Sequence, residues 1–249
     1  MTSGMRNIRL TIEYDGTDYF GWQIQKRKPT VQGEITKALE RILEEKVRLA
    51  GAARTDSGVH ALSQAANFKT RNEKLTTESL SKALNGLLPS DIVIKQAKIV
   101  PDSFHARYSA SSKIYQYKIL NQAFPSALER RFSWHLPKAL DWRKIREASQ
   151  YFIGKYDFSP FSVRGSTRKS GQCTVRDFKI KKVKNLYILQ IEADSFLYRM
   201  VRRIVGALIE VGRGKIEPEY IRALLHRKAS TLRAQTAPAH GLFLIKVKY

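Results

Sequence analysis

The order of hydrophobic periods along the first part of the chain constrains the fold more than any other feature. Asn7 to Tyr14 alternates apolar and polar residues, which is the period of a half-buried strand. Thr30 to Glu45 and Thr77 to Leu88 repeat apolar residues at helical spacing, and Pro89 ends the second of these helices. Three apolar stretches predict further strands: 47–50, 65–68 and 91–100. Strands and helices in this order indicate an α+β sheet with helices on one face.

The second part of the chain continues the mixture of strands and helices. Ser112 to Lys118 alternates, so Tyr115 and Tyr117 should lie on the same face of a strand. Asp141 to Phe152 and Phe196 to Val211 predict helices. A hairpin is predicted over 175–183 and 186–193, and a closing strand over 241–247. We therefore expect two α+β halves, residues 5–108 and residues 109–249.

The charge of the chain indicates a polyanionic partner. Lysine and arginine number 45 against 22 acidic residues, which gives a net charge of +23 and an isoelectric point near 10.2. Such an excess favours binding to nucleic acid, because each neutralised phosphate releases counterions. A membrane surface is the weaker alternative, since the chain has no lipidation motif, no basic amphipathic anchor and no apolar run that would span a bilayer. The single cysteine, Cys173, fits a reducing cytoplasm.

One loop motif carries the candidate chemistry. The Asp-Ser-Gly turn after Thr55 leaves the carboxylate of Asp56 two residues from the guanidinium of Arg54 and four from the imidazole of His60. A carboxylate among cations, in a loop between core strands, is typical of a nucleophile or a general base. The alternative is an aspartate that only hydrogen-bonds its own turn.

The helix predicted at 196–211 carries a second candidate, Arg202. Its apolar residues form one broad arc, and Arg199 and Arg203 lie outside this arc, on the side expected to face solvent or RNA. Arg202 falls at the edge of the arc, where a desolvated guanidinium needs an anionic partner. The alternative is an arginine that extends to the surface and pairs with any nearby acid or carbonyl group.

Three further segments could contact nucleic acid. The aromatic residues of 19–23 could stack on bases or pack in the core, and the same choice applies to Tyr115 and Tyr117. The loop 163–169 offers three cations that could bind RNA backbone or simply lie at the surface: Arg164, Arg168 and Lys169.

The sequence lacks the motifs of cofactor-dependent enzymes. It has no Cys/His cluster with zinc spacing, no phosphate-binding or dinucleotide-binding glycine loop, and no nucleophile elbow. We therefore expect no metal and no nucleotide cofactor. Two other classes stay open: a catalytically silent RNA-binding protein, and a metal-dependent nuclease that uses Asp15, Asp18 and Asp56.

Several motifs in order make the chain resemble the bacterial tRNA pseudouridine synthase A family, nearly from end to end. They are Tyr14-Asp15-Gly16 with Gly21-Trp22-Gln23, Arg54-Thr55-Asp56 with Gly58-Val59-His60, Phe104-His105-Ala106-Arg107, Tyr115-Gln116-Tyr117, Met200-Val201-Arg202, Ile204-Val205-Gly206 and Gly241-Leu242. The chain departs from the family pattern at Ala53, where the family usually has glycine before Arg-Thr-Asp.

The resemblance implies an α+β fold of two lobes, with a mixed, mostly antiparallel sheet, helices and a basic central cleft. It implies an isomerase that converts uridine to pseudouridine at positions 38, 39 and 40 of the tRNA anticodon stem-loop. It also implies a cytoplasmic homodimer that shares one tRNA across its subunits.

The resemblance also implies roles for four residues. Asp56 matches the catalytic aspartate, the nucleophile, and Arg202 matches the basic residue that forms an ion pair with it. Tyr115 matches the tyrosine that packs on the target base, and Arg54 matches the arginine that holds the flipped nucleotide. The residue types fit this chemistry. The target base must leave its stack to be reached, which favours an aromatic wall such as Tyr115. A nucleophile such as Asp56 must then stabilise a transient adduct.

Overall fold

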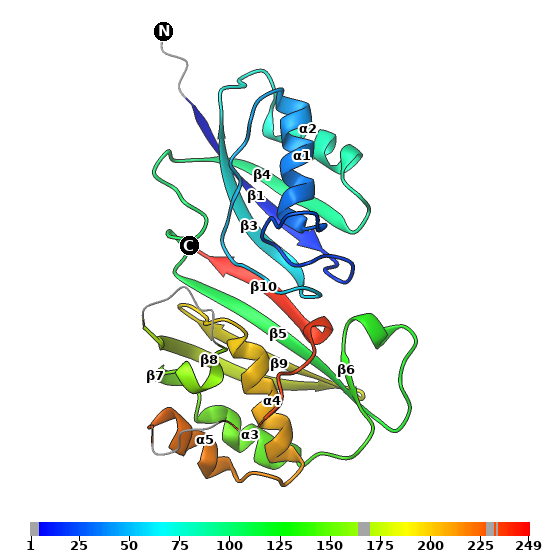
Figure 1. Ribbon diagram of the computed structural model, residues 1–249, viewed down its shortest axis with the longest axis vertical. Coiled ribbons are helices and arrows are strands. Elements are labelled where there is room, and N and C mark those ends of the chain that lie inside the picture. Colours follow the sequence, from blue (N-terminus) through cyan, green and yellow to red (C-terminus); the bar gives the residue numbers. More distant parts are fainter. Residues whose placement is uncertain (1–4, 164–169, 228–231, 233) are drawn as a thin grey trace. The chain divides into compact units, whose positions relative to one another are not determined.

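The computed structural model describes residues 5–163, 170–227, 232 and 234–249 (Figure 1). The chain divides into two compact units: Met1–Ser111 with Phe243–Tyr249, and Ser112–Leu242. Each unit combines strands with helices, and each contains one parallel strand pairing among antiparallel ones. The predicted α+β class with a mixed, mostly antiparallel sheet is confirmed. Arg164, Arg168 and Lys169, named above as candidate RNA contacts, lie outside the described residues.

The strands of the first unit are arranged around β1 (Arg6–Tyr14). β1 pairs antiparallel with β3 (His60–Thr70) on one side and with β4 (Ile92–Val100) on the other. β3 also pairs antiparallel with β2 (Ala50–Gly51) and parallel with β10 (Leu242–Lys248). The alternation in the sequence places every second residue of β1 in the core, each at most 3% exposed: Ile8, Leu10, Ile12 and Tyr14.

Two helices complete the first unit, α1 (Val31–Leu43) and α2 (Thr77–Leu87), and they lie side by side in Figure 1. A threonine caps each N-terminus: the side chain of Thr30 accepts a hydrogen bond from the Gly33 backbone, and that of Thr76 from the Ser79 backbone. The boundaries predicted from helical spacing and from Pro89 are therefore confirmed to within about two residues.

The strand predicted at 47–50 is wrong except at its last residue, Ala50. Val47 and Leu49 are buried, as a strand would bury them, but side chains of α1 satisfy their backbone groups. The Val47 amide donates to the Glu40 carboxylate at 3.3 Å, and the Gln32 side-chain amide donates to the Leu49 carbonyl at 2.8 Å. A buried apolar pair is therefore not enough to predict a strand here, because a neighbouring helix supplies the hydrogen bonds.

The second unit contains a four-strand antiparallel array in the order β5 (Ser112–Asn121), β9 (Leu186–Ala193), β8 (Gln172–Val183) and β7 (Gly154–Asp157). The predicted hairpin of β8 and β9 is confirmed, and Lys184 adopts a left-handed φ of 53° in its turn. The short strand β6 (Trp134–Leu136) pairs parallel with β5.

Three helices pack together in the second unit, with α3 (Trp142–Gln150) in contact with both α4 (Met200–Gly212) and α5 (Pro218–Leu225). The periodicity predicted α3 and α4, but α4 begins at Met200 and not at Phe196. Arg199 has a left-handed φ of 59°, which cannot continue a helix toward its N-terminus. Short helical turns complete the chain at Glu129–Arg131, Ser159–Phe161 and Ala239–Gly241. Among the described residues, no helix is long and apolar enough to cross a membrane.

Candidate active site

Asp56 lies in the loop that connects β2 to β3 in the first unit. Successive side chains of this loop alternate in burial: Arg54 is exposed, Thr55 is buried and Asp56 is half-buried. The backbone amide of Val59 donates to the Asp56 carbonyl at 3.1 Å, which closes a turn in which Gly58 has a φ of +75°. The predicted turn is present, and Asp56 within it is half-buried.

The segment that follows β1 fixes the backbone on both sides of Asp56. The hydroxyl groups of Tyr14 and Thr55 are hydrogen-bonded at 2.8 Å, and the Trp22 amide donates to the Thr55 carbonyl at 3.2 Å. After Asp56, the hydroxyl of Ser57 donates to the Tyr19 carbonyl at 3.1 Å. Burial raises the pKa of Tyr14, so its hydroxyl stays protonated and can act as a donor.

Gln64 of β3 holds the start of the loop. Its side chain bonds both backbone groups of Ala53: the Ala53 amide donates to Oε1 at 3.2 Å, and Nε2 donates to the Ala53 carbonyl at 2.8 Å. Both residues are buried. The extra methyl group of Ala53, relative to the family's usual glycine, is therefore accommodated with the backbone of the loop fully bonded at that position.

His60 holds the end of the loop. The Gly16 amide donates to His60 Nδ1 at 3.1 Å, and the same nitrogen lies 3.0 Å from the Asp15 carboxylate. The imidazole is buried and stacks on Phe243 with ring centroids 4.7 Å apart. The loop that carries Asp56 is therefore fastened at both ends, which is how a scaffold holds a reactive side chain in one geometry.

Two glycines allow the segment after β1 to approach this loop so closely. A Cβ on Gly21 would lie 2.5 Å from the Thr55 carbonyl oxygen, and one on Gly16 would lie 2.0 Å from the Val59 carbonyl oxygen. Gly21 also has a φ of +85°, which other residues rarely adopt. The glycines in the first two sequence motifs thus serve the loop that contains Asp56.

We expect Gly21→Ala to destabilise the protein and to lower its turnover. The left-handed backbone costs about 1–2 kcal/mol in alanine, and the clash with Thr55 adds about 1–3 kcal/mol. Urea unfolding measures the first effect, and an assay of the activity that the family resemblance implies measures the second. Gly86→Ala is the matched control, because nothing lies within 4 Å of a Cβ at that position of α2. A Gly21→Ala protein as stable and active as the Gly86→Ala protein would contradict this account.

The carboxylates near the loop do not assemble a metal site. Among the described residues, no group of three histidine, cysteine, aspartate or glutamate side chains is placed to hold a metal ion. Asp15 accepts hydrogen bonds from the backbone and hydroxyl of Thr17 at 3.0 and 2.6 Å. Asp18 is exposed. Asp15, Asp18 and Asp56 therefore do not form the cluster that the nuclease alternative requires.

The aromatic segment after β1 divides between core and surface. Trp22 is 1% exposed and Tyr19 is 6% exposed, so both pack in the core. Phe20 is 43% exposed, and the ammonium group of Lys28 lies 4.4 Å from its ring centroid. Base stacking by Trp22 and Tyr19 is therefore not supported by their burial.

In the second unit, Tyr115 and Tyr117 both point into the buried face of β5, as the alternation predicted. Tyr117 belongs to the core: its hydroxyl donates to the Pro238 carbonyl at 2.8 Å, and Gly241 packs against its ring. Tyr115 is 7% exposed, and its ring meets that of Phe196 edge-on with centroids 5.0 Å apart. Tyr117 is therefore fixed by the polypeptide at its hydroxyl, and Tyr115 contacts an aromatic ring.

Arg202 lies in the first turn of α4 and is half-buried. Its Nε donates to the Ala237 carbonyl at 2.7 Å, and the Ala237 amide donates back to the Arg202 carbonyl at 3.1 Å. Gly206 lets this segment approach the helix, because a Cβ there would lie 2.0 Å from the Gln235 carbonyl oxygen. Burial, together with the positive charge of Arg202, lowers the pKa of His240. The Arg202 side chain is therefore held in place at its base.

Arg203, expected to face solvent or RNA, is half-buried, as is Arg199. Arg203 donates to the Pro160 carbonyl at 3.4 Å, and burial lowers the pKa of its guanidinium. Arg199 lies at the N-cap of α4, with its guanidinium carbon 5.0 Å from the Tyr198 ring centroid.

Each unit contains two of the four predicted site residues. Arg54 and Asp56 share one loop of the first unit, and Tyr115 and Arg202 belong to the second unit. The ion pair between Asp56 and Arg202 stays a prediction. The sequence analysis did not find the residues that hold these side chains, such as Tyr14, Gln64 and Ala237. These residues bond to positions that are distant in sequence, so no local pattern points to them.

Comparison with known proteins identifies the family to which the chain belongs. The family model described as tRNA pseudouridine synthase matches residues 10–109 and 148–249. The chain therefore belongs to the tRNA pseudouridine synthase family, a family of isomerases that act on uridine in tRNA.

Two similar relatives are both named tRNA pseudouridine synthase A. The one from Thermoanaerobacter sp. (strain X514) is 49% identical over 245 residues, covering 98% of this chain and 100% of the relative. The one from Acetivibrio thermocellus is 46% identical over 245 residues with the same coverage. Among solved structures, an archaeal box H/ACA sRNP Nop10-Cbf5 complex has 11% identity and a TM-score of 0.37, covering 94% of this chain and 46% of that chain.

Proposed function

We propose that this protein converts uridine to pseudouridine at positions 38, 39 and 40 of the tRNA anticodon arm, with Asp56 as the nucleophile. The observation that carries the proposal is the loop of Asp56, in which hydrogen bonds fix the neighbours on both sides of this half-buried residue. Family membership and the net charge of +23 both fit a tRNA substrate.

The reaction is an isomerisation and requires no co-reactant. The bond between C1′ and N1 breaks, the uracil rotates, and a bond forms between C1′ and C5. The proton on C5 is lost, and N1 gains a proton. A carboxylate can form a transient covalent adduct that keeps the base or the sugar bound between these two steps. This role requires the carboxylate form of Asp56.

The other three site residues have supporting roles in this proposal. Arg202 pairs with Asp56, which would keep the carboxylate ionised and oriented. Tyr115 packs on the target base and can pass the proton at C5 through its hydroxyl. Arg54, exposed on the same loop as Asp56, holds the flipped nucleotide by its phosphate.

We expect Arg202→Ala to lower turnover by about 10- to 1,000-fold, since loss of a hydrogen bond to a charged group costs about 1.5–3 kcal/mol and the orientation of Asp56 would be lost as well. Arg203→Ala is the control, because it removes the same charge from the next residue of α4. Single-turnover kinetics with saturating enzyme separate turnover from tRNA binding. Equal turnover in the two variants would mean that Arg202 does not act on Asp56.

Release of tritium from tRNA labelled at C5 of uridine tests the activity itself. Isomerisation must release the C5 hydrogen to water, and RNA binding alone must not. Tritium release by the wild-type protein, without chain cleavage, supports the proposal. Binding without release would favour the second candidate, a catalytically silent RNA-binding protein, for which the net charge of +23 is the supporting observation.

We also propose that the protein is a cytoplasmic homodimer whose subunits share one tRNA, bound in a basic cleft between the two lobes. Light scattering coupled to size-exclusion chromatography should give twice the chain mass of 28.5 kDa. A single-chain mass at micromolar concentration would contradict the shared arrangement.

A further inference from the structure

We propose that the loop 105–108 is a stacking surface for an unpaired nucleotide of the tRNA, with the ring of Tyr108 under the base and Arg107 on the phosphate. This inference rests on the proposed function, because it requires an RNA substrate. It concerns a part of the first unit that the mechanism above does not use. The supporting observation is that the exposed ring of Tyr108 lies beside His105 and Arg107 on one loop. The buried side-chain amides of Asn7 and Asn67 fix the backbone of this loop.

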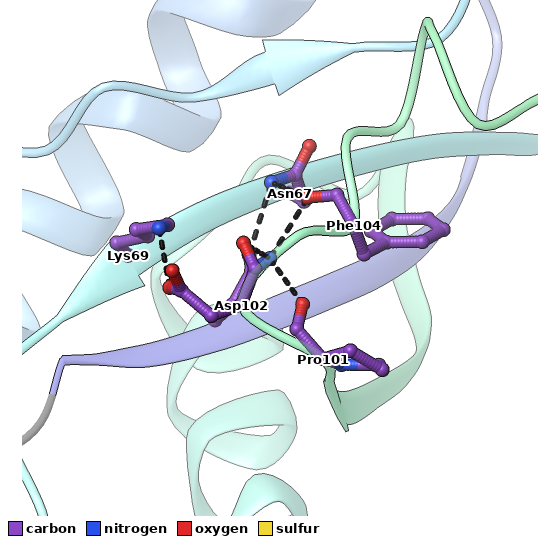
Figure 2. Close-up of polar contacts among 6 residues, drawn as sticks. Asn67, Lys69, Pro101, Asp102 and Phe104 are labelled. Carbon is purple, nitrogen blue, oxygen red and sulfur yellow. Dashed lines mark hydrogen bonds and ion pairs between the residues drawn. The ribbon is translucent and has the colours of Figure 1, made fainter.

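Two buried asparagines bond to the backbone of this loop and of the residues just before it, and Figure 2 shows one of them, Asn67. Nδ2 of Asn7 donates to the carbonyls of Pro101 and Phe104, each at 2.9 Å. Nδ2 of Asn67 donates to Oδ1 of Asn7 at 3.0 Å and to the Phe104 carbonyl at 3.4 Å. Oδ1 of Asn67 accepts from the Ala106 amide at 2.8 Å. Asn7 and Asn67 are 2% and 6% exposed, so both amides serve almost entirely to fix this loop.

Tyr249 also contacts the loop and the residue before it. The hydroxyl of Tyr249 donates to the Ala106 carbonyl at 3.0 Å, and its ring packs on Phe104 with centroids 4.8 Å apart. The guanidinium carbon of Arg9 lies 5.5 Å from the Tyr249 ring centroid. Burial raises the pKa of Tyr249 to about 12, so its hydroxyl remains a donor at neutral pH. The backbone of Phe104 and of Ala106 is thus tied to Asn7, Asn67 and Tyr249 of the first unit.

The tip of the loop is tied to itself. His105 Nδ1 accepts from the Arg107 amide at 3.1 Å and from the Tyr108 amide at 3.4 Å. The ring centroids of His105 and Tyr108 lie 4.4 Å apart. The guanidinium carbon of Arg107 lies 5.6 Å from the Tyr108 ring centroid. Tyr108 nevertheless remains 76% exposed. Its position is therefore set in advance, and most of its surface is open to a ligand.

The charges around the ring fit a nucleotide. The carboxylate of Asp102, three residues before the loop, is paired with Lys69 (Figure 2). Within the described part of the chain, no carboxylate pairs with Arg107. Aromatic rings stack on unpaired bases, and a guanidinium binds phosphate in two-point geometry. A preformed ring lowers the entropy cost of such binding.

Tyr108→Ala should weaken binding of unmodified tRNA transcript by about 5- to 140-fold, the range that corresponds to about 1–3 kcal/mol per stacked base. Tyr108→Phe should bind within about twofold of wild type, because the ring is kept. Phe124→Ala is the matched control, since Phe124 is equally exposed, at 80%, but belongs to the second unit and has no cation–π contact among the described residues.

Two further readouts separate stacking from other roles. Arg107→Gln should lower the slope of log affinity against log salt concentration by roughly one unit, whereas Tyr108→Ala should leave the slope unchanged. The melting temperature of Tyr108→Ala should equal that of wild type, because the side chain is 76% exposed.

Wild-type affinity in Tyr108→Ala would overturn the inference while leaving the proposed function intact. A change of oligomeric state in Tyr108→Ala would also overturn it, because the ring would then contact a second copy of the chain. If the wild-type protein forms no pseudouridine but Tyr108→Ala still weakens tRNA binding, the proposed function fails and the stacking surface stands.

Discussion

Asp56→Asn is expected to abolish pseudouridine formation and to leave tRNA affinity unchanged or slightly higher. The substitution is nearly isosteric, so the turn closed by the Val59 amide can form as before. It removes the negative charge, and a neutral amide is too weak a nucleophile to form the adduct. Affinity depends mainly on lysine and arginine contacts with phosphates, to which an anion contributes nothing favourable.

The matched control for Asp56→Asn is Asp18→Asn, which makes the same change on an exposed aspartate of the first unit. Asp18→Asn should form pseudouridine at the wild-type rate. Equal rates in Asp56→Asn and wild type would remove Asp56 from the nucleophile role. A loss of tRNA binding in a folded Asp56→Asn protein would instead assign Asp56 to organising the RNA site.

Tyr115→Phe is expected to slow turnover by about 10²- to 10⁴-fold, the usual contribution of a proton-transfer group. The ring and its edge-on contact with Phe196 are kept, so tRNA affinity should change little. Tyr115→Ala should weaken productive binding as well, because the stacking surface is lost. Single-turnover rates over a series of enzyme concentrations separate the two effects.

Tyr117→Phe is the control for this prediction, because it removes a hydroxyl two residues away on the same face of β5. That hydroxyl bonds the Pro238 carbonyl, so its loss should cost about 1–3 kcal/mol of stability and little turnover. A wild-type rate in both Tyr115→Phe and Tyr115→Ala would place Tyr115 in the core, as Tyr117 is.

The sequence predicts the elements with long and regular patterns. β1 alternates over its whole length, and α1 combines helical spacing with a threonine cap, so both were found nearly at their observed bounds. The strands β6 and β7 have three and four residues, which is too short for a period to be seen. The spacing of apolar residues predicts that α4 begins at Phe196, but the helix begins at Met200. The left-handed backbone of Arg199 prevents the helix from extending further toward the N-terminus.

The sequence predicts the reactive side chains of the candidate site but not the residues that hold them in place. Asp56 and Arg54 form a motif within one loop, and Arg202 attracts attention as a cation at the edge of an apolar arc. The residues that hold them are distant in sequence: Gln64 bonds Ala53 across 11 positions, and Ala237 bonds Arg202 across 35. Such contacts depend on how strands and helices pack, and no local pattern encodes them. The close approach permitted by Gly21 has the same origin.

Mapping of pseudouridine in unmodified tRNA transcripts after incubation with the protein tests the central claim most directly. Chemical labelling followed by reverse transcription reads each uridine of the chain separately. We predict new pseudouridine at positions 38, 39 and 40 with the wild-type protein, and none at these positions with Asp56→Asn. Pseudouridine at other positions would contradict the assignment to the anticodon arm, and its absence from every position with the wild-type protein would contradict the proposed enzyme.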